Sequence, residues 1–162
     1  GLEDAVAVAA ALGDRLVVWG VVEDPEYAKK IEAVSPPGTI DWRGFLPTDE
    51  LQNQLRACRA LLNTPKWNEA YGNVVVEAMA CGVPVVAYDR GGPGELITSG
   101  VTGWLAPPDD VEAMTKAVKQ IDRIDRRECR NWVEESASHD GFAKRVESWI
   151  KEGIKTNESS SG

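Results

Sequence analysis

Residues 60–88, ALLNTPKWNEAYGNVVVEAMACGVPVVAY, contain a complete strand–helix–strand unit. Ala60–Asn63 predicts a short strand, and Asn73–Cys81 predicts a helix that ends at Gly82. Val83–Tyr88 is a continuous apolar run, which is typical of a strand buried on both faces of a parallel sheet. Two strands joined through a helix form a right-handed crossover and lie parallel to each other. The stretch therefore predicts an α/β fold.

The same alternation continues on both sides of this unit. The other predicted elements are helix Leu2–Leu12, strand Arg15–Trp19, helix Pro25–Val34, strand Thr39–Arg43, a helix from an N-cap at Thr48 to Cys58, helix Pro93–Thr98, strand Gly103–Leu105, a helix from Asp109 or Asp110 to Gln120, and helices Arg123–Glu135 and Gly141–Gly153. We expect one doubly wound, Rossmann-like parallel sheet with helices on both faces. Such a domain normally opens with a strand, whereas this sequence opens with a helix, so we expect the first strand to be missing.

Composition limits the classes of function. The chain has 162 residues, of which 43% are hydrophobic, and this suffices for one domain with a core. The net charge of −8 argues against a nucleic-acid partner. The three cysteines and single histidine predict reduced thiols and no metal site. No secretory signal and no apolar span are visible in the sequence, and the reduced thiols favour a cytoplasmic protein. We expect one domain over residues 1–153 and a flexible Ser- and Gly-rich tail over 154–162.

The segment Thr64–Gly82 carries the candidate site. Ligands of doubly wound sheets bind outside the carboxyl ends of the strands, and this segment leaves such an end. Gly72 and Asn73 lead into the next helix, whose first N–H groups and dipole can hold a diphosphate. A carboxylate placed on a phosphate would repel it. Glu69 and Glu77 are therefore interpreted as flanking the phosphates and accepting hydrogen bonds from sugar hydroxyls.

A second Gly-rich turn, DRGGPGE at residues 89–95, again joins a strand end to a short helix. It offers backbone donors and close approach to a ligand. It is not a dinucleotide-binding fingerprint, because the glycine required three residues after Gly94 is replaced by Ile97. A redox Rossmann domain is therefore disfavoured.

The motifs together resemble a known family. EAYGNVVVEAMACGVPVVA at residues 69–87 contains E-x7-E, and GGPGELI at 91–97 and GVTGWL at 100–105 follow it. In this order they are similar to the family 4 retaining glycosyltransferases of the GT-B fold, over roughly Leu2–Pro108. The resemblance implies the C-terminal, nucleotide-sugar-binding half of a GT-B enzyme. The N-terminal domain of the same enzyme, which supplies the acceptor pocket and any membrane association, would be the missing partner.

The resemblance also implies a role for each matched position. Glu69 would be the catalytic residue, contacting the transferred sugar, and Glu77 would bind the ribose hydroxyls of the donor. The other donor-binding positions would be Ala70, Tyr71, Gly72, Asn73 and Val74 around the sugar and diphosphate, Phe45 and Leu46 beside the nucleobase, and Gly92 and Glu95 at the closing turn. The arginine and lysine that grip the diphosphate in the family would precede Gly1. Lys66 and Arg90 are the nearest cations available to replace them.

The resemblance thus implies a hexosyltransferase fragment that needs no cofactor. A hexose would pass from a nucleotide diphosphate sugar to an unknown acceptor with retention, UDP-glucose being favoured over GDP-mannose. The isolated chain is expected to be inactive without the N-terminal domain. A non-catalytic nucleotide or nucleotide-sugar sensor is the alternative, and a pair of carboxylates about 5 Å apart would instead suggest a retaining hydrolase.

Simpler interpretations remain open for single residues. Glu77 could be an ordinary surface glutamate of a helix, and Glu69 a solvated loop residue. The glycines could be turn and cap residues of any α/β domain. Trp67 could stack on a ligand or only pack, whereas Trp42 and Trp104 are expected to pack.

Overall fold

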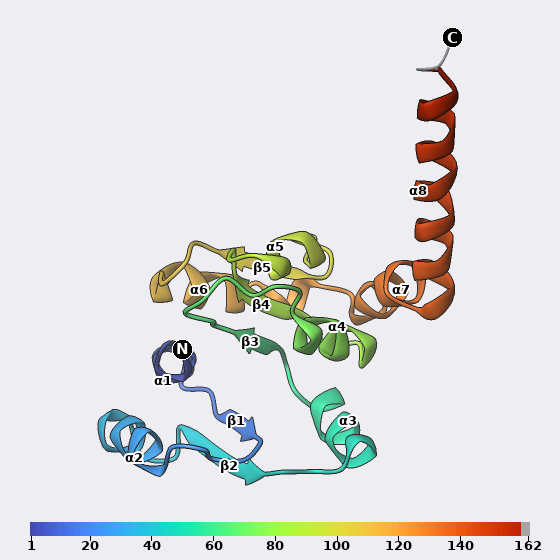
Figure 1. Ribbon diagram of the computed structural model, residues 1–162. Coiled ribbons are helices and arrows are strands. Elements are labelled where there is room, and N and C mark those ends of the chain that lie inside the picture. Colours follow the sequence, from blue (N-terminus) through green and yellow to red (C-terminus); the bar gives the residue numbers. More distant parts are fainter. Residues whose placement is uncertain (160–162) are drawn as a thin grey trace.

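The computed structural model describes the backbone of residues 1–159 and the side chains of residues 1–152 (Figure 1). Helices and strands alternate along most of this length. In chain order the elements are α1 (Leu2–Leu12), β1 (Leu16–Trp19), α2 (Pro25–Val34), β2 (Ile40–Gly44), α3 (Thr48–Arg56), β3 (Leu61–Asn63), α4 (Asn73–Ala80), β4 (Val85–Tyr88), α5 (Gly92–Leu96), β5 (Gly103–Ala106), α6 (Val111–Val118), the short 3₁₀ helix η1 (Ile121–Arg123), α7 (Arg126–Ser136) and α8 (His139–Ser159).

The strands form two parallel sheets. One contains β1 and β2, and the other has the order β3-β4-β5. Within residues 1–159, β1 and β3 do not pair with each other, so the expected sheet is divided between them. The α/β class and the parallel strands confirm the prediction from sequence. The division explains why β1, predicted to be a buried strand, has only half-buried residues along its whole length.

Helices cover both faces of the sheets. α1 packs against α6, which also contacts β4 and β5, and α4 packs against α7 and contacts β3 and β4. In Figure 1, α8 projects away from the rest of the chain. No described helix is long and apolar enough to cross a bilayer.

The hydrophobic core is centred on β4. All four residues of this strand are buried, as the apolar run 83–88 predicted. Val75 and Met79 of α4, Met114 of α6 and Cys129 of α7 pack around it with no exposed surface. The core thus fixes α4, whose amino end lies at the candidate site.

Helix boundaries follow local chemistry. Asp110, rather than Asp109, caps α6 by accepting from the Ala113 amide (2.8 Å). Thr48 is not the N-cap of α3: the cap position is Pro47, whose side chain cannot accept a hydrogen bond. α8 continues to Ser159, past the predicted end at Gly153. Residues 160–162 of the predicted flexible tail, 154–162, lie outside the described residues.

Candidate functional site

The two Gly-rich segments contact each other at the carboxyl ends of β3 and β4. The Gly92 amide donates to the Glu69 carbonyl (2.7 Å), and Glu69 and Gly91 form an isolated parallel bridge. A Cβ on Gly92 would lie 2.2 Å from the Tyr71 carbonyl oxygen, and one on Gly91 2.3 Å from that of Glu69. Gly91 also has φ 77°, which disfavours any side chain. Both glycines are therefore needed for the close approach of the two turns.

The amino end of α4 opens beside this contact. Gly72 is its N-cap, with φ 95° and ψ 55°, a left-handed conformation that suits glycine. The first helical hydrogen bond runs from the Val75 amide to the Gly72 carbonyl (2.9 Å), so the amides of Asn73 and Val74 precede it. Asn73 and Val74 are exposed. The two amides and the helix dipole can therefore bind an anion.

Glu69 lies in the loop before this helix start, and Glu77 lies in the second turn of α4. Glu69 is half-buried and accepts a hydrogen bond (3.3 Å) from the indole nitrogen of Trp67, a residue that is 62% exposed. Glu77 is exposed, and within residues 1–152 its carboxylate makes no hydrogen bond or ion pair. Glu77 and Val74 line a cavity of about 690 Å³. Both carboxylates are thus accessible to a ligand.

The cations predicted for the diphosphate are paired with acids. Lys66 Nζ contacts the carboxylates of Asp4 and Asp109, the latter at 2.8 Å. Arg90 donates to Asp109 (2.6 Å) and to the Pro65 carbonyl (3.1 Å). Hydrogen bonds from Lys66 and then Arg90 lower the pKa of Asp109, and the bonds to Asp109 and Asp4 raise the pKa of Lys66. Lys66 and Arg90 are therefore adjacent, but their charge is balanced by two carboxylates.

The same network ties α1 to the end of β4. The Tyr88 hydroxyl donates to Asp4 (2.6 Å), and burial, followed by this hydrogen bond, raises the pKa of Tyr88. Lys66 Nζ lies 5.8 Å from the centre of the Tyr88 ring. Asp109 adopts a positive φ of 64°, which is uncommon for a residue other than glycine. Asp4, Tyr88 and Asp109 were not predicted as site residues, because only the fold brings them to Lys66.

The sequence motifs predict that a nucleoside diphosphate such as UDP binds here, so replacing Asp109 with asparagine is expected to strengthen UDP binding about threefold to tenfold by releasing Lys66 and Arg90. Asparagine tolerates the left-handed conformation, so the backbone should not change. Titration calorimetry or NMR at two salt concentrations measures the change, and the variant should show the steeper salt dependence. Asp122→Asn, which removes a carboxylate paired with Arg59, is the matched control. Equal affinities in the two variants would show that the cations do not reach the diphosphate.

The remaining predicted residues have varied positions. Ala70 and Tyr71 are exposed in the loop before α4, and Glu95 is exposed on α5. Phe45 and Leu46 follow β2, which belongs to the other sheet, and the Phe45 side chain is 75% exposed. Trp42 and Trp104, which were predicted to be buried packing residues, are only half-buried; Trp104 packs against the core. Their indole nitrogens are buried without a hydrogen-bond partner among the described residues. No described group of His, Cys, Asp and Glu could hold a metal ion.

A parallel α/β domain with two Gly-rich turns at the carboxyl ends of its strands and a helix start beside them has the arrangement with which Rossmann-type domains bind phosphates. The family model for glycosyl transferases group 1 matches residues 13–139. The chain therefore belongs to this glycosyltransferase family. This confirms the family resemblance deduced from the sequence motifs.

Individual relatives agree with the family. The chain is 36% identical to the 2-deoxystreptamine N-acetyl-D-glucosaminyltransferase of Streptomyces fradiae, over 72% of this chain and 30% of that protein. It is 45% identical to the alpha-1,3/1,6-mannosyltransferase alg-2 of Neurospora crassa, over 41% of this chain and 14% of the relative. Anabaena Alr3699/HepE, solved in complex with UDP, has a similar fold (TM-score 0.70, 22% identity, 96% of this chain and 44% of that one). The chain thus spans less than a third of these two curated relatives.

Proposed function

We propose that this chain is the donor-binding domain of a retaining hexosyltransferase that uses a nucleotide diphosphate sugar. The observation that carries the proposal is the hydrogen bond from the Gly92 amide to the Glu69 carbonyl, which joins the two Gly-rich turns next to the α4 amino end. Asn73 and Val74 would donate their amides to the diphosphate. Glu77 would accept from the ribose hydroxyls, and Glu69 from the transferred sugar, where it would stabilise developing charge.

UDP-glucose is the donor that we propose, with GDP-mannose as the second choice. The UDP complex of Alr3699/HepE supports uridine as the base. The two curated relatives described above are named as transferases of mannose and of N-acetylglucosamine, so they do not identify the sugar that this chain would use. Glucose is therefore a proposal. Phe45, exposed after β2, would border the base.

The acceptor and most of the reaction face would come from an N-terminal domain, without which we expect no transfer. The three free thiols fit a cytoplasmic protein.

A non-catalytic sensor would share the nucleotide subsite but would have no need of Glu69. Glu69→Gln should therefore separate the two functions. In a glycosyltransferase domain the substitution is expected to lower the affinity for UDP-glucose about fivefold and to leave the affinity for UDP unchanged, because only the sugar contact loses its charge. Titration calorimetry of both ligands measures this difference, and UDP serves as the internal control. Equal losses for the two ligands would place Glu69 at the nucleotide and contradict its proposed role.

A further inference from the structure

Helices α3 and α4 both run from the candidate crevice to the opposite edge of the sheet. α3 follows residues 45–47, which would border the base, and α4 follows Gly72 at the proposed diphosphate subsite. The carboxyl end of α3 precedes β3 and that of α4 precedes β4, and these two strands pair in parallel. Both helix carboxyl ends therefore lie at the amino edge of the β3-β4-β5 sheet, away from the crevice.

Arg126, the first residue of α7, binds both carboxyl ends at once. Its three guanidinium nitrogens donate to three different carbonyls: Nε to Gly82 (2.6 Å), Nη1 to Cys58 (3.0 Å) and Nη2 to Arg56 (2.8 Å). Arg56 is the last residue of α3, and Gly82 lies two residues after the end of α4. The guanidinium thus satisfies carbonyls that the helix ends leave without a partner, and it joins α3 to α4.

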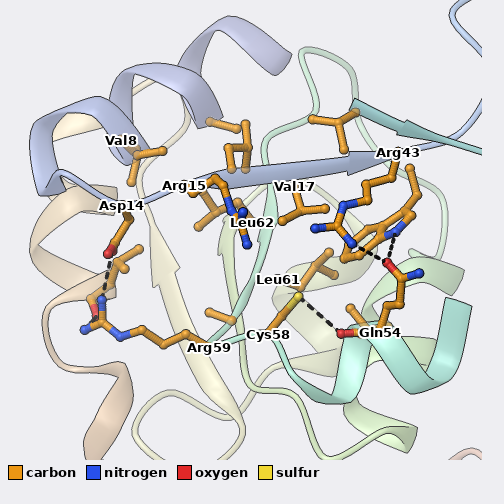
Figure 2. A pocket seen from close by; sticks show the side chains of 18 of the residues that line it. Val8, Asp14, Arg15, Val17, Arg43, Gln54, Cys58, Arg59, Leu61 and Leu62 are labelled. Carbon is orange, nitrogen blue, oxygen red and sulfur yellow. Dashed lines mark hydrogen bonds and ion pairs between the residues drawn. The ribbon is translucent and has the colours of Figure 1, made fainter. Parts of the chain in front are cut away.

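The opposite side of α3 is bonded to the β1–β2 sheet. Figure 2 shows Gln54 of α3 beside Arg43 of β2, which donates to the Gln54 side-chain oxygen (3.1 Å). The indole nitrogen of Trp19 in β1 donates to the same oxygen (3.2 Å). Leu55 is buried in the core, so α3 keeps an apolar anchor that does not depend on Arg126. Arg126 therefore connects α4 to a helix that is itself bonded to the sheet bearing residues 45–47.

A second arginine of α7 provides a comparison. Arg130 Nη1 donates to the carbonyl of Ala80, the last residue of α4 (2.8 Å), and Arg130 Nε donates to Glu134 of its own helix (2.7 Å). Both arginines place positive charge at a helix carboxyl end, which is favourable for the helix dipole. Arg130 contacts the end of α4 alone, whereas Arg126 contacts the ends of both helices. The two residues thus separate the effect of charge from the effect of joining α3 to α4.

We propose that Arg126 is a positioning residue for nucleotide binding, which sets the spacing between the base side and the diphosphate side of the crevice by joining the far ends of α3 and α4. This role rests on the proposed function, since it requires a nucleoside diphosphate as the ligand. Such a ligand contacts two subsites through one molecule, and its affinity falls when their spacing prevents simultaneous contact. Inorganic pyrophosphate contacts only the α4 side, so its affinity does not depend on this spacing.

The test measures the affinities of UDP and inorganic pyrophosphate for the parent chain, Arg126→Gln and Arg130→Gln by NMR titration. Arg126→Gln is expected to weaken UDP binding about fivefold and pyrophosphate binding less than about twofold. The UDP-induced shifts of the Phe45 and Leu46 amides should shrink, while those at the start of α4 persist. Arg130→Gln should change both affinities by the same factor or leave both unchanged, because α3 keeps its bonds to Arg126.

Arg126→Lys tests whether charge alone is sufficient. Lysine keeps the positive charge but lacks the fixed fork of the guanidinium, so this variant should bind UDP as weakly as Arg126→Gln does. Arg126 is exposed, so neither substitution opens a cavity in the core, and thermal unfolding checks that the variants are folded.

Three results would overturn the proposal: parent UDP affinity in Arg126→Gln, equal weakening of UDP and pyrophosphate by that variant, or recovery of the parent UDP affinity by Arg126→Lys. A parent chain that does not bind UDP would instead contradict the proposed function, so the two failures are distinguishable.

Discussion

Replacing Glu77 with alanine is expected to weaken UDP binding about 10- to 100-fold without lowering the thermal stability of the chain. A carboxylate that accepts from both ribose hydroxyls makes charge-assisted hydrogen bonds, whose loss is costly. The folded chain should not be affected, because Glu77 is exposed and makes no hydrogen bond or ion pair within residues 1–152. Binding is measured by NMR titration and stability by thermal unfolding.

The matched control is Glu32→Ala, which removes an exposed glutamate from α2. It should leave UDP affinity unchanged. A second comparison uses 2′-deoxy-UDP, which the parent chain should bind more weakly than UDP, whereas Glu77→Ala should bind the two nearly alike. If Glu77→Ala keeps the parent affinity and the parent preference for the ribose, Glu77 is only a surface residue of α4.

Replacing Gly92 with alanine is expected to abolish detectable UDP binding and to lower the free energy of unfolding by about 1–3 kcal/mol. The new Cβ would lie 2.2 Å from the Tyr71 carbonyl oxygen and 2.6 Å from the Tyr71 Cα. Since both neighbours are backbone atoms, the two Gly-rich turns must separate, and the hydrogen bond to the Glu69 carbonyl would be lost. Denaturant unfolding and NMR titration measure the two effects.

Gly94→Ala is the control for the same turn. Its Cβ would meet only the Asp89 side chain, which is exposed and can move away. We therefore expect a near-parent stability and nucleotide affinity. If Gly92→Ala binds UDP as well as Gly94→Ala does, contact between the turns is not required for the site.

The sequence predicted elements whose causes are local. α1 and α2 have the predicted bounds, and α4 begins at Asn73 as predicted. Apolar runs, caps and glycines determine these elements within a few neighbouring residues. The family was also recognisable, because its motifs lie within one stretch around Glu69 and Glu77. The roles of these two glutamates stay predictions.

Features that depend on distant residues could not be predicted. The division of the sheet between β1 and β3 depends on strand pairing, which no local pattern specifies. The neutralisation of Lys66 requires Asp4 and Asp109, which lie 62 and 43 residues away in sequence. Threonine is a favoured N-cap residue, so Thr48 was predicted to be the cap of α3. In the structure Thr48 is instead the first helical residue, and Pro47 occupies the cap position.

The most direct test of the donor-site proposal is a ¹⁵N NMR titration of the chain with UDP, GDP, ADP and NADH. Chemical shifts detect weak binding, so the test does not depend on high affinity. The account predicts that UDP shifts the amides of residues 72–77 and 91–95 together, that GDP does so less, and that NADH does not. If no nucleotide shifts these amides, or if NADH shifts them as strongly as UDP does, the crevice is not a nucleotide-sugar site and the central claim is wrong.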